Sequence, residues 1–186
     1  LRHPTVTECW QVEIDERVVT ACKEHLGSIG RGVWDDPRLD LRFEDGLEFV
    51  KGTEERFDVV ILDGSDPTGP SEGLFDRGFY EGVKRTLHDD GLFALPSGSP
   101  TGTEDLFYEI QRAVRAVFGC ARPYFGAVTL FGVGAWTWTI AGTPDPLVIE
   151  ADRVAAIAEG CDHYSAEIHA AAFVTPASVR RRLERG

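Results

Sequence analysis

Apolar and polar positions in the first third of the chain alternate between strand-like and helical patterns. The segment 9–15, CWQVEID, predicts a strand, and apolar residues at helical spacing predict a helix after it. Residues 38–45 alternate as a strand does, and 46–52 predict a short helix. The run 57–63, FDVVILD, is apolar apart from its two aspartates, which predicts a strand buried on both faces. Strands that alternate with helices in this way are typical of a parallel sheet.

The remainder of the chain begins with the same alternation and then changes. A helix is expected over 74–87, a strand over 91–97, and a further helix over 103–119 that ends at Gly119. Residues 122–142 contain two strand-like runs joined through Gly132 and Gly134, which predicts an antiparallel pair at the edge of the sheet. The tail reads as helical. With no repeat and no convincing linker, the pattern predicts one α/β domain over 1–186 with a mainly parallel sheet.

The charge balance narrows the class of ligand. The chain has 31 acidic and 19 basic residues and a net charge of −12. Such a protein repels nucleic acid and anionic membranes at long range and attracts cationic ligands, so neither nucleic acid nor membrane is expected as a partner. The alternative, that the acidity only maintains solubility, stays open.

The cysteines and the hydropathy of the chain indicate a cytoplasmic protein without metal. The four cysteines, Cys9, Cys22, Cys120 and Cys161, lie far apart, with no C-x-x-C pair and no histidine at ligand spacing. This spacing favours reduced thiols over zinc or a disulfide framework. No apolar run approaches the roughly 18 residues that a membrane span needs, and no signal peptide opens the sequence.

Carboxylates follow three successive predicted strands. Glu13 and Asp15 follow the first, Asp45 the next, and Asp63 and Asp66 the third. Because ligands of open parallel sheets bind beyond the carboxyl ends of the strands, we expect these groups at one ligand-binding edge. Each of them could instead be a helix cap or a turn residue.

The positions of the carboxylates at two of these strand ends predict that they bind a nucleoside. A carboxylate after the second strand of a nucleotide-binding sheet usually accepts hydrogen bonds from ribose hydroxyls, which is the expected role of Glu13. Asp45 could accept from an adenine amino group, while Gly46 lets the backbone come close. The third strand end, VVILDGSDPTGP (59–70), presents two carboxylates in a loop stiffened by two prolines. We expect this loop to receive a cationic amine.

These segments together resemble the polyamine aminopropyltransferases, the spermidine synthase family. The resemblance rests on VEIDERVV, DDPRLDLRFEDGLEFV, FDVVILDGSDPTGPSEGLFDRGFYEGVKRTL, SGSP and YSAEIHAAAFVTP, in this order from about residue 3 to residue 176. The D-x-x-D-P-x-G-P element is its most specific part. The resemblance implies a Rossmann-like, class I methyltransferase-like domain. Its activity would transfer an aminopropyl group from decarboxylated S-adenosylmethionine to a diamine such as putrescine, giving spermidine and methylthioadenosine without a metal.

The resemblance also implies a role for each matching residue. Asp63 would accept the proton of the attacking amine, and Asp66 would anchor the other ammonium group. Glu13 would hold the ribose, and Asp45 with Gly46, Pro70 and Ser71 would line the adenine site. Phe131 and Tyr164 would contact the amine substrate, and the loop 64–70 would cover the site. Relatives of this kind assemble as dimers or tetramers, so a homo-oligomer is expected.

Three features depart from the family pattern. The glycine-rich turn of the family's first strand and the β-domain before it are absent, which predicts a gap in the sheet between the Glu13 and Asp63 strands and a fragment of a longer protein. Pro96 stands where relatives often carry glutamine, and Phe131 where they often carry tyrosine. Two alternatives therefore stay open: a methyltransferase-like protein that uses ordinary S-adenosylmethionine, and a non-catalytic homologue that binds polyamine or a partner chain.

Overall fold

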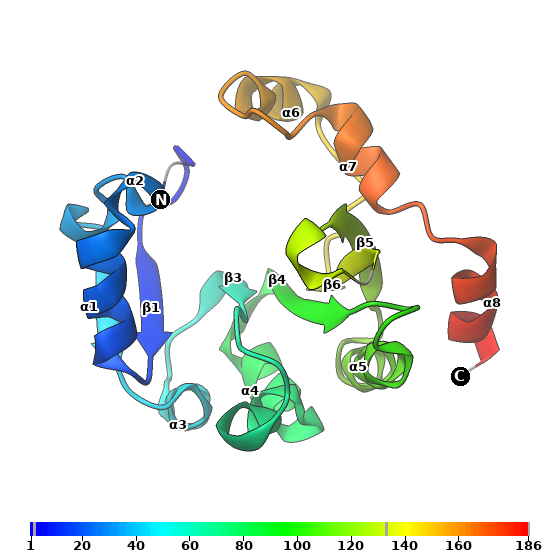
Figure 1. The fold of residues 1–186 in the computed structure, drawn as a ribbon, viewed down its shortest axis with the longest axis horizontal. Coiled ribbons are helices and arrows are strands. Elements are labelled where there is room, and N and C mark those ends of the chain that lie inside the picture. Colours follow the sequence, from blue (N-terminus) through cyan, green and yellow to red (C-terminus); the bar gives the residue numbers. More distant parts are fainter. Residues whose placement is uncertain (2, 133, 186) are drawn as a thin grey trace. The chain divides into compact units, whose positions relative to one another are not determined.

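The structure is a computed structural model, and it describes residues 1, 3–132 and 134–185. The chain divides into two compact units, residues 1–53 and 54–186, and each is described by itself. Figure 1 shows the elements of both units. In the described residues the strands form two separate sheets, one in each unit.

The first unit is built on two parallel strands. β1 (Cys9–Glu13) pairs with β2 (Leu39–Phe43) in a register that runs from Cys9 opposite Leu39 to Glu13 opposite Phe43. The other elements of the unit are α1 (Glu16–His25), α2 (Gly27–Gly30), the 3-10 turn η1 (Val33–Asp35) and α3 (Gly46–Gly52). Since parallel strands end at the same edge, Glu13 and the start of α3 lie at one edge of this sheet.

Arg38 ties the N-terminal segment to the start of β2. Its guanidinium donates to the carbonyl oxygens of Val6 and Leu1, both at 2.8 Å, and pairs with the Asp36 carboxylate at 2.7 Å. Hydrogen bonds from the Arg38 side chain and backbone lower the pKa of Asp36 to about 2. The ion pair therefore anchors a segment that has no regular secondary structure.

The second unit contains a four-stranded sheet in the order β3-β4-β6-β5. β3 (Phe57–Ile61) and β4 (Leu87–Gly98) are parallel, whereas β6 (Ala135–Gly142) is antiparallel to both β4 and β5 (Arg122–Ala127). The predicted antiparallel pair at the sheet edge is confirmed. Gly132 and Gly134, in the connection before β6, have φ of 64° and 80°, which favours glycine at both positions.

Two helices cover one face of this sheet. α4 (Arg77–Thr86) and α5 (Glu104–Phe118) contact each other and both contact β4, so they lie on the same face. Phe93 of β4 joins them: its ring lies 5.8 Å from Tyr80 and 5.7 Å from Phe118. Gly119 ends α5 with φ of 80°, as predicted for a glycine after a helix.

The prediction that the apolar run 57–63 is buried on both faces is wrong. Val60 pairs with Phe93 and shares its covered face, whereas Val59 and Ile61 lie on the opposite face and are 54% and 70% exposed. β3 is an edge strand of the four-stranded sheet. An apolar run shows that the side chains on both faces of a strand suit an apolar environment. It does not show that both faces are covered within this unit.

The predicted helix over 74–87 is shorter than expected. Leu74 and Phe75 belong to the 3-10 element η2 (Gly69–Phe75), and α4 begins at Arg77. Leu87 already starts β4, which also extends beyond the expected 91–97 to Gly98. The apolar residues keep their helical spacing across the change from the 3-10 element η2 to the α-helix α4. Spacing alone therefore does not show where α4 begins.

A chain of hydroxyl and amide groups lies inside the second unit, beneath α5. Thr137 donates to the Gly98 carbonyl at 2.7 Å, and Ser97 contacts both Thr137 and Thr139 at 2.9 Å. The Nε2 of Gln111 in α5 contacts the Thr139 hydroxyl. These hydrogen bonds link β4, β6 and α5, and they leave only the Oε1 of Gln111 without a partner among the described members of the chain.

The C-terminal segment forms α6 (Ala151–Ala158), α7 (Ala166–Ala172) and α8 (Ala177–Arg185). Phe173, next to α7, packs on Tyr124 of β5, which stacks on Trp138 of β6. Val179 and Leu183 of α8 pack against α5. In the part of the chain that the structure describes, no helix is long and apolar enough to cross a membrane.

Candidate active site

Two of the candidate carboxylates in the first unit cap helices. Asp15 accepts the backbone N–H of Arg17 at 2.9 Å and pairs with its guanidinium at 2.8 Å, and these bonds lower the pKa of Asp15. Asp45 accepts the backbone N–H of Leu47 at 2.8 Å and caps α3, which begins at Gly46. The alternative reading as caps is therefore correct for both residues. Asp45 caps through Oδ1, which does not exclude a ligand at its other oxygen, whereas both oxygens of Asp15 accept from Arg17.

Glu13 is the last residue of β1 and points one oxygen at the next turn. Its Oε1 accepts the backbone N–H of Asp15 at 2.9 Å, and the residue is partly buried. This bond fixes the carboxylate at the strand end. The structure thus brings Glu13, Asp45 and Gly46 to the same edge of the two-stranded sheet, as the topology predicted.

The loop after β3 presents its two aspartates to solvent. Leu62 still continues the ladder by donating to the Ala94 carbonyl at 2.9 Å, after which the chain leaves the sheet. Asp63 and Asp66 are both exposed, and no described residue forms an ion pair or a side-chain hydrogen bond with either carboxylate. Neither is held by an arginine in the interior. Both negative charges are therefore available to a ligand.

The same loop is held by its own backbone and hydroxyl groups. Thr68 donates its N–H to the Asp66 carbonyl at 2.6 Å, and the Ser65 and Ser71 hydroxyls share a hydrogen bond across the loop. Pro70 lies at the start of η2, where its missing N–H is not needed. The structure thus places Pro70 and Ser71 in one loop with Asp63 and Asp66.

Phe131 lies at the same end of the four-stranded sheet as Asp63. It ends the 3-10 turn η3 (Thr129–Phe131), shortly before β6, and the start of β6 lies beside the end of the antiparallel β4. Its ring is 48% exposed and packs on Trp136 at 4.4 Å between centroids. Topology therefore brings Phe131 to the edge at which Asp63 leaves the sheet.

Tyr164 belongs to a hydrogen-bonded cluster in the C-terminal segment. Its hydroxyl lies 3.3 Å from the Nδ1 of His169, and the Nε2 of His169 lies 2.7 Å from the Pro146 carbonyl oxygen. No described contact joins Tyr164 to the Asp63 loop, so its role with the amine stays a prediction.

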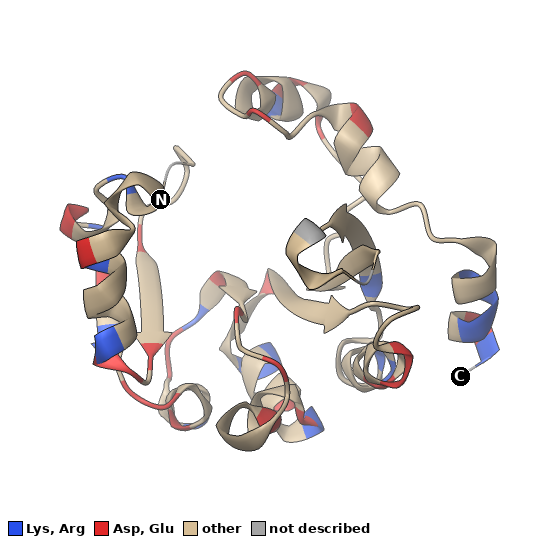
Figure 2. Ribbon diagram, viewed as in Figure 1, with Lys and Arg blue, Asp and Glu red and all other residues tan. Residues whose placement is uncertain are grey.

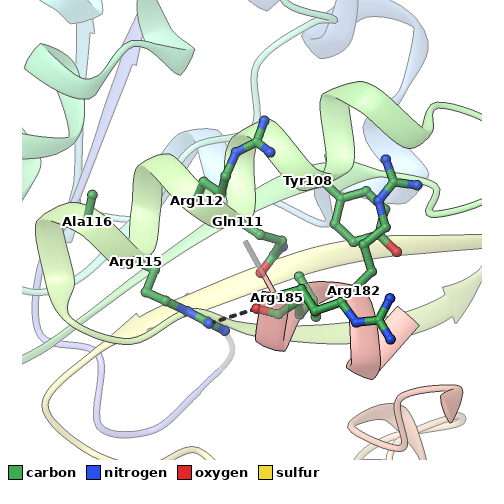
Figure 3. Close-up of a pocket in the computed structure, with 8 residues that line it drawn as sticks. Tyr108, Gln111, Arg112, Arg115, Ala116, Arg182 and Arg185 are labelled. Atoms are coloured by element: carbon green, nitrogen blue, oxygen red, sulfur yellow. Dashed lines mark hydrogen bonds between the residues drawn. The ribbon is translucent and has the colours of Figure 1, made fainter. Parts of the chain in front are cut away.

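The largest described cavity lies elsewhere in the second unit. It has a volume of about 590 Å³ and lies between α5 and α8, as Figure 3 shows. Asp63 and Asp66 line neither this cavity nor the two smaller ones described, of about 210 and 360 Å³. An open carboxylate loop at a strand end needs no enclosed volume to attract a cation.

The structure also shows residues that the sequence pattern did not reveal as a cluster. Arg112 and Arg115 of α5 and Arg182 and Arg185 of α8 line this cavity together. The sequence pattern predicts only that the tail is helical. The signal that could have found the cluster is the i, i+3 spacing of arginines in both helices. Among the described residues no group of histidine, cysteine and carboxylate side chains could hold a metal ion.

Comparisons with known proteins agree on one family. Residues 1–152 match the spermine/spermidine synthase domain. The chain is 41% identical to a polyamine aminopropyltransferase of Prochlorococcus marinus strain MIT 9313 over 98% of its length, and 36% identical to that of Bacillus subtilis strain 168 over 95%. It spans 65% and 63% of the lengths of these two relatives.

Solved structures give the same result for the fold. A crystal structure of a spermidine synthase in complex with the transition-state analogue AdoDATO matches with a TM-score of 0.91 and 30% identity, over 99% of this chain and 64% of that one. The spermidine synthase from Thermotoga maritima matches with a TM-score of 0.89 and 30% identity, over 99% of this chain and 62% of that one. The predicted α/β Rossmann-like fold with an antiparallel edge pair is confirmed.

Proposed function

The chain belongs to the spermine/spermidine synthase domain family, and on this premise we propose that it carries the transfer site of a polyamine aminopropyltransferase. The reaction moves an aminopropyl group from decarboxylated S-adenosylmethionine to a diamine such as putrescine, giving spermidine and methylthioadenosine. The observation that carries the proposal is the loop after β3, where Asp63 and Asp66 are exposed and unpaired among the described residues. Two free carboxylates three residues apart suit a substrate with two ammonium groups.

The proposed chemistry begins with a proton transfer. An alkylamine has a pKa near that of lysine, about 10.4, so it is protonated and not nucleophilic at neutral pH. Asp63 accepts a proton from the amine as it attacks, a role that typically contributes about 10²–10⁴-fold in rate. The nitrogen lone pair forms the new bond to the methylene carbon next to sulfur. The electrons of the breaking C–S bond go to the sulfur, which leaves as a neutral thioether.

The other residues of the proposed site bind and orient. Asp66 binds the distant ammonium group and thereby holds the attacking nitrogen in line with the carbon. Glu13 accepts from the ribose hydroxyls, and Asp45 with Gly46 receives the adenine. These roles fit the position of both carboxylates at the carboxyl ends of β1 and β2. Pro70 and Ser71 complete the adenine site from the loop.

Phe131 and Tyr164 complete the proposed amine site. The exposed ring of Phe131 supplies an apolar wall for the methylene groups of the amine, without a hydroxyl that could bind nitrogen. Tyr164 contacts the amine from a position that His169 holds by hydrogen bonding. We further propose that both units form one aminopropyltransferase domain, active in the cytoplasm as a homo-oligomer and without nucleic-acid or membrane partners.

The acidic character of the chain supports a decarboxylated donor. The net charge of −12 attracts a sulfonium cation and a polyamine but disfavours an additional donor carboxylate. The relative bound to AdoDATO, a transition-state analogue, supports the same class of ligand. Ordinary S-adenosylmethionine is therefore expected to bind more weakly than the decarboxylated form.

The proposal is tested by product analysis and calorimetry. The protein is incubated with decarboxylated S-adenosylmethionine and diamines of three to six carbons, and methylthioadenosine is measured. We expect its release with at least one diamine, and tighter binding of the decarboxylated donor in a calorimetric titration. Tighter binding of ordinary S-adenosylmethionine together with methyl transfer would support the methyltransferase alternative instead. Binding of polyamine without turnover of any acceptor would support the non-catalytic one.

A further inference from the structure

The cavity between α5 and α8 is lined by cationic side chains in an acidic protein. Of the eight residues that line it, four are arginines and none is acidic: Tyr108, Gln111, Arg112, Arg115, Ala116, Arg182, Leu183 and Arg185. The whole chain has 31 acidic against 19 basic residues. Figure 2 shows that basic residues also dominate α8 itself. The cavity therefore has the opposite charge to the protein around it.

Only part of this positive charge is neutralised inside the protein. Arg182 pairs with Glu104 and lies over the Tyr108 ring at 4.0 Å, and Arg115 donates to the Leu183 carbonyl oxygen at 3.2 Å. Arg112 and Arg185 have no hydrogen bond or ion pair with any described residue. Two guanidinium groups on two different helices thus remain available, each able to bind a phosphate or carboxylate through two parallel hydrogen bonds.

A second observation also indicates a ligand at this place. Gln111 is 1% exposed, and while its Nε2 contacts Thr139, its Oε1 is buried without a hydrogen-bond donor among the described residues. A buried acceptor of this kind is usually satisfied. Since Gln111 is a lining residue, a hydroxyl or amino group on a bound molecule would supply the missing donor.

We propose that this cavity binds a small organic anion with at least two negative charges, such as a phosphate ester or a polycarboxylate. Its anionic groups bind Arg112 and Arg185, and its apolar part packs on Ala116 and Leu183. A volume of about 590 Å³ suits a ligand of this size. A nucleic acid is disfavoured because it would extend from the cavity over the acidic remainder of the surface. This site is separate from the Asp63 loop and does not depend on the proposed reaction.

The test compares two double variants that remove the same charge. Arg112→Gln with Arg185→Gln removes the two unpaired lining arginines, and Arg180→Gln with Arg181→Gln removes two exposed arginines of α8 that do not line the cavity. Binding of ATP, pyrophosphate and citrate is measured by calorimetry at about 50 mM and about 150 mM salt, with adenosine as a neutral reference. Circular dichroism checks that both variants are folded.

We expect at least one of the three anions to bind, adenosine not to bind, and the lining variant to weaken binding about tenfold or more. The control variant should change it less than threefold. Tighter binding of ATP and pyrophosphate than of citrate would identify a phosphate site, and the reverse a carboxylate site. The proposal is overturned if no anion binds or if both variants lose binding equally. Self-association that depends on Arg112 and Arg185, without any anion binding, would instead assign the cavity to a second copy of the chain.

Discussion

Tyr80 offers a sharp test of the packing of the second unit. Its side chain is fully buried between α4 and the sheet, yet its hydroxyl has no hydrogen-bond partner among the described residues. A buried polar group without a partner costs about 1–3 kcal/mol. Tyr80→Phe removes the hydroxyl and keeps the ring contacts with Phe79 and Phe93 at 6.3 and 5.8 Å. We therefore expect this substitution to stabilise the protein.

The expected gain can be worked out from two opposing effects. Removing the unpaired hydroxyl recovers about 1–3 kcal/mol, whereas the small void left by one oxygen costs roughly 0.3 kcal/mol at about 24 cal/mol per Å³. The net stabilisation is about 0.7–2.7 kcal/mol, which corresponds to a rise in Tm of about 1–11 °C for a chain of this size. Urea unfolding followed by tryptophan fluorescence measures it, with an unchanged m-value as the sign that only stability changed.

The pH dependence of the same variant adds a second readout. Burial, and then the charge of Asp76, raise the pKa of Tyr80 above its ordinary value of 10.0, so the folded state disfavours the ionised form. As the pH rises past this value the unfolded chain ionises first and the wild-type protein loses stability. The advantage of Tyr80→Phe should therefore grow above about pH 10. Tyr124→Phe serves as a comparison: Tyr124 is only partly buried and burial also raises its pKa, so its effect should grow with pH in the same direction but less than that of Tyr80→Phe.

The reasoning is refuted if Tyr80→Phe lowers the free energy of unfolding by about 1 kcal/mol or more. That result would mean that the hydroxyl makes a favourable hydrogen bond in solution.

Three further predictions concern other parts of the molecule. Arg38 lowers the pKa of Asp36 to about 2, so the ionised carboxylate should contribute stability above about pH 4 that is lost as the pH falls towards 2. Arg38→Gln should abolish this loss in unfolding curves measured from about pH 5 to about pH 2. Gly142→Ala should destabilise by about 2–4 kcal/mol in urea, because φ is +140° and the new Cβ would lie 2.3 Å from a backbone oxygen, whereas Gly78→Ala, with open space around it, should not. In steady-state kinetics, Asp66→Asn should raise KM for a diamine at least tenfold but leave KM for a monoamine acceptor unchanged. An equal rise in KM for the two acceptors would contradict the anchoring role of Asp66.

The order and type of the elements were accessible from the sequence because each has a local cause. The helix 46–52 has a capping aspartate before it, the helix that ends at Phe118 has a glycine after it, and the last strand pair is joined through glycines with positive φ. Such signals lie within a few residues of the element that they define.

The burial of β3 depends on contacts that are distant in sequence. Val59 and Ile61 have the apolar character of core residues, and only the strand order shows that they lie on an uncovered face of an edge strand. The polar chain from Ser97 to Gln111 was equally hidden, since its members become partners only when β6 and α5 pack against β4. Periodicity describes one element at a time and cannot assign such partners.

Some features of the candidate site could be predicted from the sequence, and others could not. The positions of Glu13, Asp45 and Asp63 at strand ends followed from the alternation of strands and helices. That Asp15 and Asp45 serve as caps, while Asp63 and Asp66 have no described partner, required side-chain coordinates. The arginine cavity combines residues about 70 positions apart, whose proximity no local pattern contains.

The most direct test of the proposed function is the rate of methylthioadenosine release by Asp63→Asn under single-turnover conditions with saturating diamine. Asp58→Asn is the matched control, because Asp58 is an exposed aspartate of β3, the strand that precedes Asp63, and its substitution removes the same charge. If Asp63 accepts the proton of the amine, the Asp63 variant should react about 10²–10⁴ times more slowly than the wild-type protein, and the control should keep its rate within twofold. An undiminished rate in the Asp63 variant would contradict the account.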